Sequence, residues 1–224
     1  MSDRLSKEEL KEDKVATVAL EAVDYARRNV RWFVGAAGLV VVILAVTLVL
    51  VQSRAKAARE ASLVLMRAQA LAMNGSYAEA LPQLETLAGR FGSTPAGREG
   101  RLFLGAGQLA AGNPAAAEQA FRKFLASRPS DPLTESAARR GLAGSLADQG
   151  KHAEAAAEYQ KAARIAGNPL AGDDWLQAGL TLQRAGQRDA AAQAFQEIIA
   201  NHPRSSAAAE ARVRLREALA VSGS

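Results

Sequence analysis

The chain has 224 residues, of which 49% are hydrophobic, and a formal net charge of +5. It contains no cysteine, which excludes disulfides and thiolate metal sites. The basic excess lies after residue 53 and is spread along the chain, and aromatic residues make up only 5%, so we expect no nucleic-acid partner, which would need clustered cations and stacking platforms.

Residues 1–31 form a polar tail with seven basic and seven acidic side chains. Ser6 and Glu9 have the spacing of a capping box, in which each side chain satisfies a free backbone N–H at a helix start. We therefore expect this tail to be partly helical.

An apolar run from Trp32 to Val51 contains no charge, amide or proline and carries thirteen Leu, Ile, Val or Phe side chains. As a helix it would be about 30 Å long, which matches the hydrocarbon core of a bilayer. Those side chains favour membrane insertion by about −4 to −8 kcal/mol. The run predicts a transmembrane helix over residues 32–53, with a core helix of a soluble domain as the alternative.

A cleaved signal peptide is a further interpretation of this region, because Ala55-Lys56-Ala57 has small residues at the positions that flank a cleavage site. The polar segment before the run and the run itself are both too long for a typical signal, which favours a retained anchor. Basic residues on the two flanks are equal in number, so the positive-inside rule gives no orientation. The amino side has Lys14, Arg27, Arg28 and Arg31, and the carboxyl side has Arg54, Lys56, Arg59 and Arg67.

A patch of small residues within the run is the candidate for helix packing inside the membrane, and consists of Gly35, Ala36, Ala37 and Gly38. It has no pair of glycines at four-residue spacing, so the close-packed dimer motif is missing. This favours contact with a different membrane protein, and self-association through the span or the following domain stays open as the alternative.

Residues after the run repeat with a period of 36 to 38, marked by Gly75, Gly112, Gly150 and Gly186. A small residue lies seven positions before each glycine. An alanine lies five positions after the glycine, and a bulky residue follows four positions after that alanine. The small residues are Ala68, Gly105, Ala143 and Gly179; the alanines are Ala80, Ala117, Ala155 and Ala191; the bulky residues are Leu84, Phe121, Tyr159 and Phe195. Two antiparallel helices pack closely when a small residue on one receives a bulky side chain from the other, and glycine suits the turn between them.

This pattern resembles the tetratricopeptide repeat. The last unit carries most of the signature, with Trp175, Gly179, Leu182, Ala191, Phe195 and Pro203. The second unit matches at Leu104, Gly105, Ala117, Phe121 and Pro129; the third matches at Leu142, Ala143, Ala155 and Tyr159; the first keeps Ala68, Tyr77, Ala80 and Leu84. The usual period of 34 is exceeded, so we expect longer turns between repeats.

The resemblance implies an all-α fold in which the transmembrane helix is followed by an α-solenoid over residues 54–224. We expect four helix pairs, at about residues 60–95, 97–132, 135–170 and 171–206, and a capping helix over 207–219. A cap is needed because a stacked array exposes an apolar face at its end.

The order of polar tail, single span and terminal repeats resembles the ancillary subunit of the bacterial Sec translocon. That resemblance implies an inner-membrane protein with a cytoplasmic tail, periplasmic repeats, and translocon subunits, a periplasmic chaperone or an exported polypeptide as partners. Residues 201–206 also look like repeats of the Tol-Pal coordinator and of outer-membrane assembly lipoproteins. Those proteins are exported with a cleaved signal or a lipid, and this chain has no cysteine for a lipid.

Chemistry-bearing residues do not gather into a predicted active site. His152 and His202 fall at a repeat turn and before a proline, without neighbouring ligands, and no glycine-rich phosphate loop is present. Asp173 and Asp174 are adjacent, and we interpret them as a helix cap before Trp175. We therefore expect no enzyme activity, no metal and no cofactor.

The repeat register predicts which residues line the concave groove, where tetratricopeptide domains bind their partners. They are Leu65, Gln69, Glu99, Leu102, Ala106, Leu109, Arg140, Leu176, Leu180 and Gln183. Domains of this family that clamp a terminal carboxylate use Lys and Asn at two positions of the first repeat, which are Leu65 and Gln69 here. The predicted ligand is therefore a helix or an extended apolar segment, or a second copy of the domain.

Overall fold

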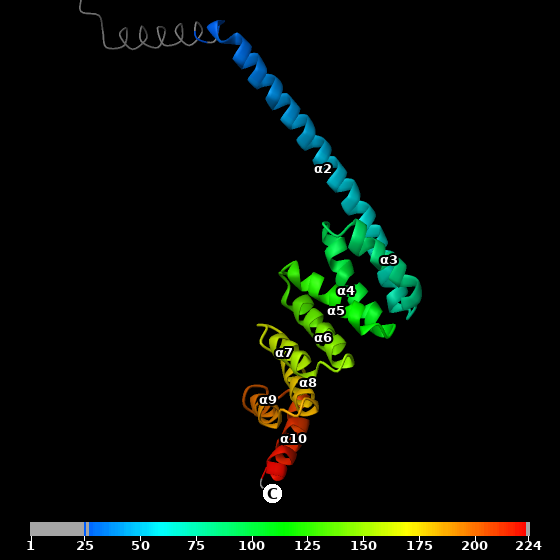
Figure 1. Ribbon diagram of the computed structural model, residues 1–224, viewed down its shortest axis with the longest axis vertical. Coiled ribbons are helices and arrows are strands. Elements are labelled where there is room, and N and C mark those ends of the chain that lie inside the picture. The colour runs from blue at the N-terminus through cyan, green and yellow to red at the C-terminus, as the bar shows by residue number, and fades with distance from the viewer. Residues whose placement is uncertain (1–24, 26, 223–224) are drawn as a thin grey trace, which may run out of the picture. The chain divides into compact units, whose positions relative to one another are not determined.

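The computed structural model describes residue 25 and residues 27–222, and every regular element in these ranges is a helix (Figure 1). The helices are α2 (Val30–Met73), α3 (Tyr77–Arg90), α4 (Pro95–Ala110), α5 (Pro114–Ala126), α6 (Pro132–Asp148), α7 (His152–Ala163), α8 (Ala171–Arg184), α9 (Arg188–Asn201) and α10 (Ala207–Ser222). This confirms the predicted all-α class. The expected helix start at Ser6 and Glu9 lies outside the described residues.

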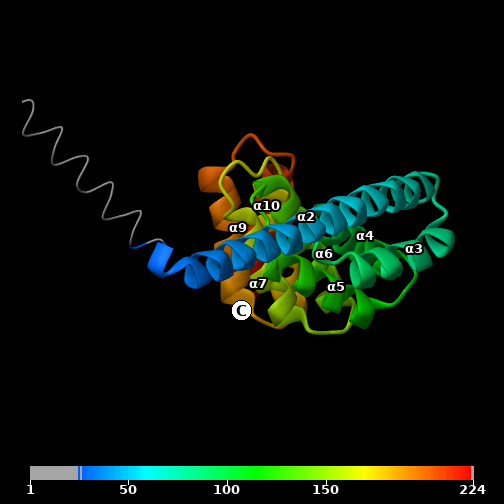
Figure 2. The same cartoon turned by 90° about the horizontal axis from the view of Figure 1, so that it is seen from above.

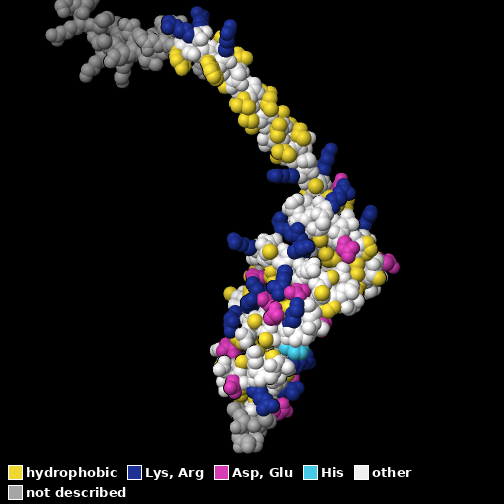
Figure 3. Space-filling model, in the orientation of Figure 1, with side chains coloured by type: hydrophobic (Ala, Val, Ile, Leu, Met, Phe, Trp, Pro, Cys, Tyr) yellow, Lys and Arg dark blue, Asp and Glu magenta, His cyan; other side chains and the backbone are white. Residues whose placement is uncertain are grey.

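The chain divides into two compact units, residues 1–55 and residues 56–224. The described part of the first unit is mainly the apolar portion of α2, whose most apolar window has a mean hydropathy of 2.9 and no buried surface. The large hydrophobic side chains described along it are exposed to solvent (Figure 3). The apolar run of α2 from Trp32 to Val51 makes about 30 Å of helix, which is long enough to cross a bilayer.

The second unit consists of helix pairs joined by tight turns. The last part of α2 pairs with α3, α4 with α5, α6 with α7, and α8 with α9. Neighbouring helices from α3 to α10 pack side by side in chain order (Figures 1 and 2). Within each pair a glycine closes the turn with φ between +74° and +76°, a region that residues with a Cβ adopt at a cost. These are the four periodic glycines: Gly75, Gly112, Gly150 and Gly186.

Close packing within the pairs follows the predicted exchange of small and bulky residues. A Cβ at Gly105 would lie 2.8 Å from the ring of Phe121, and one at Gly179 would overlap the ring of Phe195. Phe121 also touches the next pair, because a Cβ at Gly141 would overlap the same ring. One aromatic side chain on α5 therefore sets the approach of both α4 and α6.

The last helix, α10, covers the carboxyl-terminal end of the array. Its residues Ala207, Ala208 and Ala211 are at most 2% exposed and join the core cluster around Phe195. The alanines allow α10 to approach α9 and α8 closely, and they remove the apolar end face of the last pair from water.

The expectation that Asp173 and Asp174 cap the helix before Trp175 is wrong. Helix α8 begins at Ala171, with Leu170 at its N-cap position, so both aspartates lie inside the first turn. Asp173 accepts a hydrogen bond from Ser206 Oγ at 2.9 Å, whereas the side chain of Asp174 is buried. Sequence spacing missed this start because the N-cap residue, Leu170, makes no side-chain cap hydrogen bond, so no capping residue marks it.

Candidate functional site

An apolar hollow of about 480 Å³ lies between the first helices of the second and third repeats. Three of the predicted groove residues line it: Leu102, Ala106 and Leu109. The remaining lining residues were not predicted and are Phe103, Ala110, Phe121, Ala137 and Gly141. No charged side chain contributes to the lining, so the hollow suits an apolar side chain rather than an ion.

Small residues create this hollow. Ala106 and Ala110 on α4 lie across from Ala137 and Gly141 on α6, and none of the four has a side chain larger than a methyl group. The Phe121 ring closes the space from α5 and leaves no room for a Cβ at Gly141. The lining offers no polar side chain to water, so an apolar side chain that displaces the water is favoured.

Two predicted groove residues hold the first and second repeats together. Gln69 Nε2 on α2 donates a hydrogen bond to Glu99 Oε1 on α4, with a distance of 3.2 Å. This hydrogen bond is exposed to solvent. The Gln69 amide and the Glu99 carboxylate can therefore break it and bond to a polar group of a ligand instead.

Arg140, also predicted for the groove, lies in a polar contact between the third and fourth repeats. Its Nη1 atom is 3.2 Å from Asp174 Oδ2, and Asn168 Nδ2 donates to the same carboxylate at 2.7 Å. Burial raises the pKa of Asp174, while the hydrogen bond from Asn168 and the charge of Arg140 act in the opposite direction. Arg140 therefore forms an ion pair that links α6 to α8.

Two other predicted groove residues are core residues. Leu65 packs with Leu87 and Phe91, and Leu176 packs in the cluster around Phe195, with both leucines 7% exposed. Leu180 is half-buried against that same cluster. Gln183 lines a separate hollow of about 210 Å³ beside Arg188 and α10. The structure thus brings three of the ten predicted residues into one apolar hollow and places the others elsewhere.

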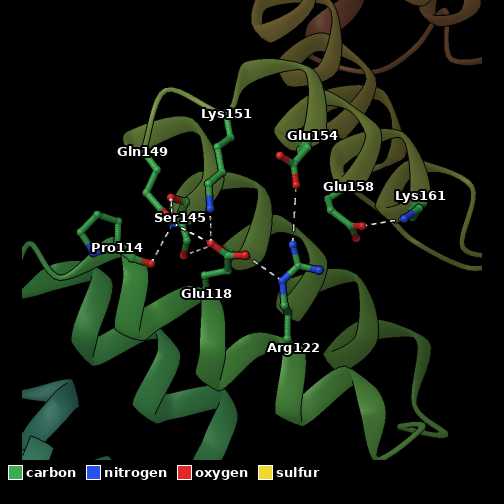
Figure 4. A network of polar contacts seen from close by, with 10 residues as sticks. Pro114, Glu118, Arg122, Ser145, Gln149, Lys151, Glu154, Glu158 and Lys161 are labelled. Atoms are coloured by element: carbon green, nitrogen blue, oxygen red, sulfur yellow. Dashed lines mark hydrogen bonds and ion pairs between the residues drawn. The ribbon is translucent and has the colours of Figure 1, made fainter.

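A polar network joins the second repeat to the third (Figure 4). Glu118 on α5 accepts hydrogen bonds from Lys151 Nζ at 3.0 Å, Gln149 Nε2 at 2.9 Å and Arg122 Nε at 2.8 Å. The bonds from Lys151 and Gln149 are the main reason why the pKa of Glu118 falls to about 2. Arg122 continues the network to Glu154 at 3.8 Å. This network fixes the turn between α6 and α7 on α5, and sequence spacing contained no signal for it.

The two histidines occupy helix ends. His152 is the first residue of α7 and His202 is the C-cap of α9. His152 Nδ1 is buried without a hydrogen-bond partner. Among residues 25 and 27–222, no three His, Asp or Glu side chains come together as a metal site.

Comparison with known families settles what the repeats are. One tetratricopeptide repeat profile matches residues 65–132 and 133–169, and a second matches residues 175–205. Together they cover more than half of the chain and every helix pair. The chain belongs to the tetratricopeptide repeat family. Repeats of this family indicate a protein–protein interaction scaffold with protein partners. No curated protein sequence matches the chain significantly.

Proposed function

We propose that this tetratricopeptide repeat protein is a membrane-anchored scaffold, and that the hollow between α4 and α6 binds an apolar side chain of a partner helix or extended segment. The apolar lining of that hollow carries the proposal, because the eight lining residues include no charge. Exposed polar groups at Gln69 and Glu99 on the first helices of the first two repeats supply hydrogen bonds for the partner's backbone or side chains.

The anchor in this proposal is the apolar part of α2, which is long enough to cross a bilayer and has no buried surface within the described chain. The retained span places the repeats at a membrane surface. Tail, single span and terminal repeats occur in the same order in the ancillary subunit of the bacterial Sec translocon. We extend the proposal on that resemblance to an inner-membrane adaptor with periplasmic repeats, whose partners are translocon subunits, a periplasmic chaperone or an exported polypeptide.

The role of the hollow as the binding site is tested by placing a large side chain in it. A photocrosslinking amino acid at Ala110, which is exposed on α4, should form an adduct with the partner in cells. Ala106→Arg adds a charged side chain to the hollow and should reduce this adduct by roughly tenfold or more, since a bound partner would bury that charge without a counter-charge, which costs several kcal/mol. Ala157→Arg is the matched control, because Ala157 is an exposed mid-helix alanine on α7.

Equal adduct yields from the two arginine variants, with unchanged helical content by circular dichroism, would exclude the hollow as the binding site. The export role has a separate test in reporters of compartment fused at Ser2 and Ser224. A cytoplasmic carboxyl terminus would refute the translocon proposal and leave the scaffold proposal standing.

A further inference from the structure

Helix α2 presents an apolar stripe to solvent on the side that faces away from the repeat core. Leu63, Met66 and Met73 are 57%, 60% and 88% exposed, and Ala70 between them is also exposed. The opposite side of the same helix is covered: Ala61 and Ala68 are 0% exposed and pack toward α3. Three large apolar side chains aligned on one helix face are more than scattered surface residues, and such faces mark interaction surfaces.

The stripe has the spacing of a coiled-coil seam. Leu63, Met66, Ala70 and Met73 follow one another at intervals of three, four and three residues, which places them at alternating a and d positions. A hollow of about 500 Å³ lies beside the first two, lined by Ala58, Arg59, Ser62, Leu63 and Met66. The surface therefore offers both protruding side chains and a hole beside them, as a symmetric interface between identical helices requires.

In the described part of the chain, a terminal helix packs over one end of the repeat array but not over the other. At the carboxyl-terminal end α10 buries Ala207, Ala208 and Ala211 against the last pair. Within the described residues of the repeat unit, no helix covers the outer side of α2 in an equivalent way. A helix of a second copy would cover it.

We propose that residues 63–73 of α2 pair in parallel with the same residues of a second copy in the same membrane. The inference rests on the membrane anchoring proposed above. Two anchored copies have the same orientation, and their stripes begin at the same chain distance from Val51, so identical residues meet in register. Leu63 then packs on Leu63 and Met66 on Met66. The seam begins at Leu63, because the preceding seam position is the exposed, charged Arg59.

The strength of this helix pairing depends on the attachment of both copies to one membrane. A seam of four positions is too short a coiled coil to associate strongly between free helices in water. Confinement to one bilayer raises the effective concentration of the second helix, so the pairing is a property of the anchored chain.

The natural absence of cysteine allows a direct test by single-cysteine crosslinking of the full chain in its membrane. Met66→Cys and Met73→Cys lie on the stripe, Arg67→Cys lies on α2 about 100° away from Met66, and Gln193→Cys lies on the exposed side of α9. A disulfide requires Cα atoms within about 7 Å, so the two stripe variants should yield roughly fivefold more linked dimer than either control. Adding Met73→Glu to Met66→Cys should abolish this difference, because it places two like charges in the seam.

Equal dimer yields at all four positions, or no dimer at any of them, would overturn the pairing. An adduct with a protein of another mass at Met66→Cys would also overturn it and assign the stripe to a different partner. Alkaline carbonate extraction of the same membranes shows whether the pairing alone is refuted or the membrane anchor as well. A chain that stays in the membrane pellet without dimer leaves the anchored scaffold intact, whereas a chain released by carbonate refutes both proposals.

Discussion

Glu118 shows how one carboxylate joins two repeats. Its side chain is 15% exposed and accepts hydrogen bonds from Lys151, Gln149 and Arg122, which come from two different helix pairs. Hydrogen bonds to a charged acceptor are stronger than neutral ones, and they stabilise the ionised form. The pKa of Glu118 is accordingly lowered from 4.5 to about 2.

This lowered pKa predicts a pH dependence of stability. A carboxylate whose folded pKa lies below its unfolded pKa stabilises the fold above the unfolded value, and the contribution is lost as the pH falls toward the folded value. Glu118→Gln should therefore lower the free energy of unfolding by about 1–2 kcal/mol at pH 7, and its difference from wild type should shrink between pH 4.5 and about 2. Urea unfolding at several pH values measures both quantities.

Glu79→Gln provides the control, since Glu79 is an exposed carboxylate in the first turn of α3. It should change the unfolding free energy much less than Glu118→Gln does at pH 7. A constant difference between wild type and Glu118→Gln from pH 7 to pH 3 would contradict the role assigned to the charge.

At the scale of the helix pair, glycine determines how closely two helices approach. Gly105 on α4 receives the Phe121 ring at a distance that excludes a Cβ, whereas a Cβ at Gly144 on α6 would meet Leu109 Cδ2 at 3.5 Å, an ordinary contact distance. Both glycines lie within helices, where alanine is otherwise preferred by about 1 kcal/mol. The same substitution therefore has opposite expected effects at the two positions.

Gly105→Ala should destabilise the repeat domain by about 1–3 kcal/mol, because overpacking forces α4 and α5 apart. Gly144→Ala should be neutral or stabilising by up to about 1 kcal/mol, since the added methyl group makes an ordinary contact and lowers the entropy of the unfolded chain. Thermal or urea unfolding distinguishes the two. Similar midpoints for both variants would mean that the Phe121 contact does not control the packing.

For the whole molecule, the proposed membrane anchor is the apolar part of α2, which is long and apolar enough to cross a bilayer. Its window of mean hydropathy 2.9 carries no ionisable residue from Trp32 to Val51. Each arginine placed near the middle of a span opposes insertion by about 2.5–3.5 kcal/mol, so two of them offset most of the favourable energy of this run.

Val42→Arg combined with Leu44→Arg should move the chain from the membrane pellet to the supernatant after alkaline carbonate extraction. The matched control exchanges the two residues, Val42→Leu with Leu44→Val, and should leave the chain in the pellet because composition and hydropathy are unchanged. Retention of the double arginine variant in the pellet would mean that the repeats, and not the span, hold the protein at the membrane.

Local regularities allowed the sequence by itself to determine the all-α class and the repeat register. The glycines at 36- to 38-residue spacing adopt positive φ at each turn, and the small and bulky positions meet as Gly105 with Phe121 and Gly179 with Phe195. Such features depend on residues within one helix pair, where chain distance and spatial distance correspond.

Only the tertiary structure decided how neighbouring pairs meet. It buried Leu65 and Leu176 in the core, paired Arg140 with Asp174, and left Leu102, Ala106 and Leu109 around an apolar hollow. Those outcomes depend on the angle and separation between successive pairs, which arise from many side-chain contacts across long chain distances. The repeat register predicts on which face of its helix a residue lies. The angle at which the next helix packs decides whether that residue lines a groove, lies in the core or forms an ion pair.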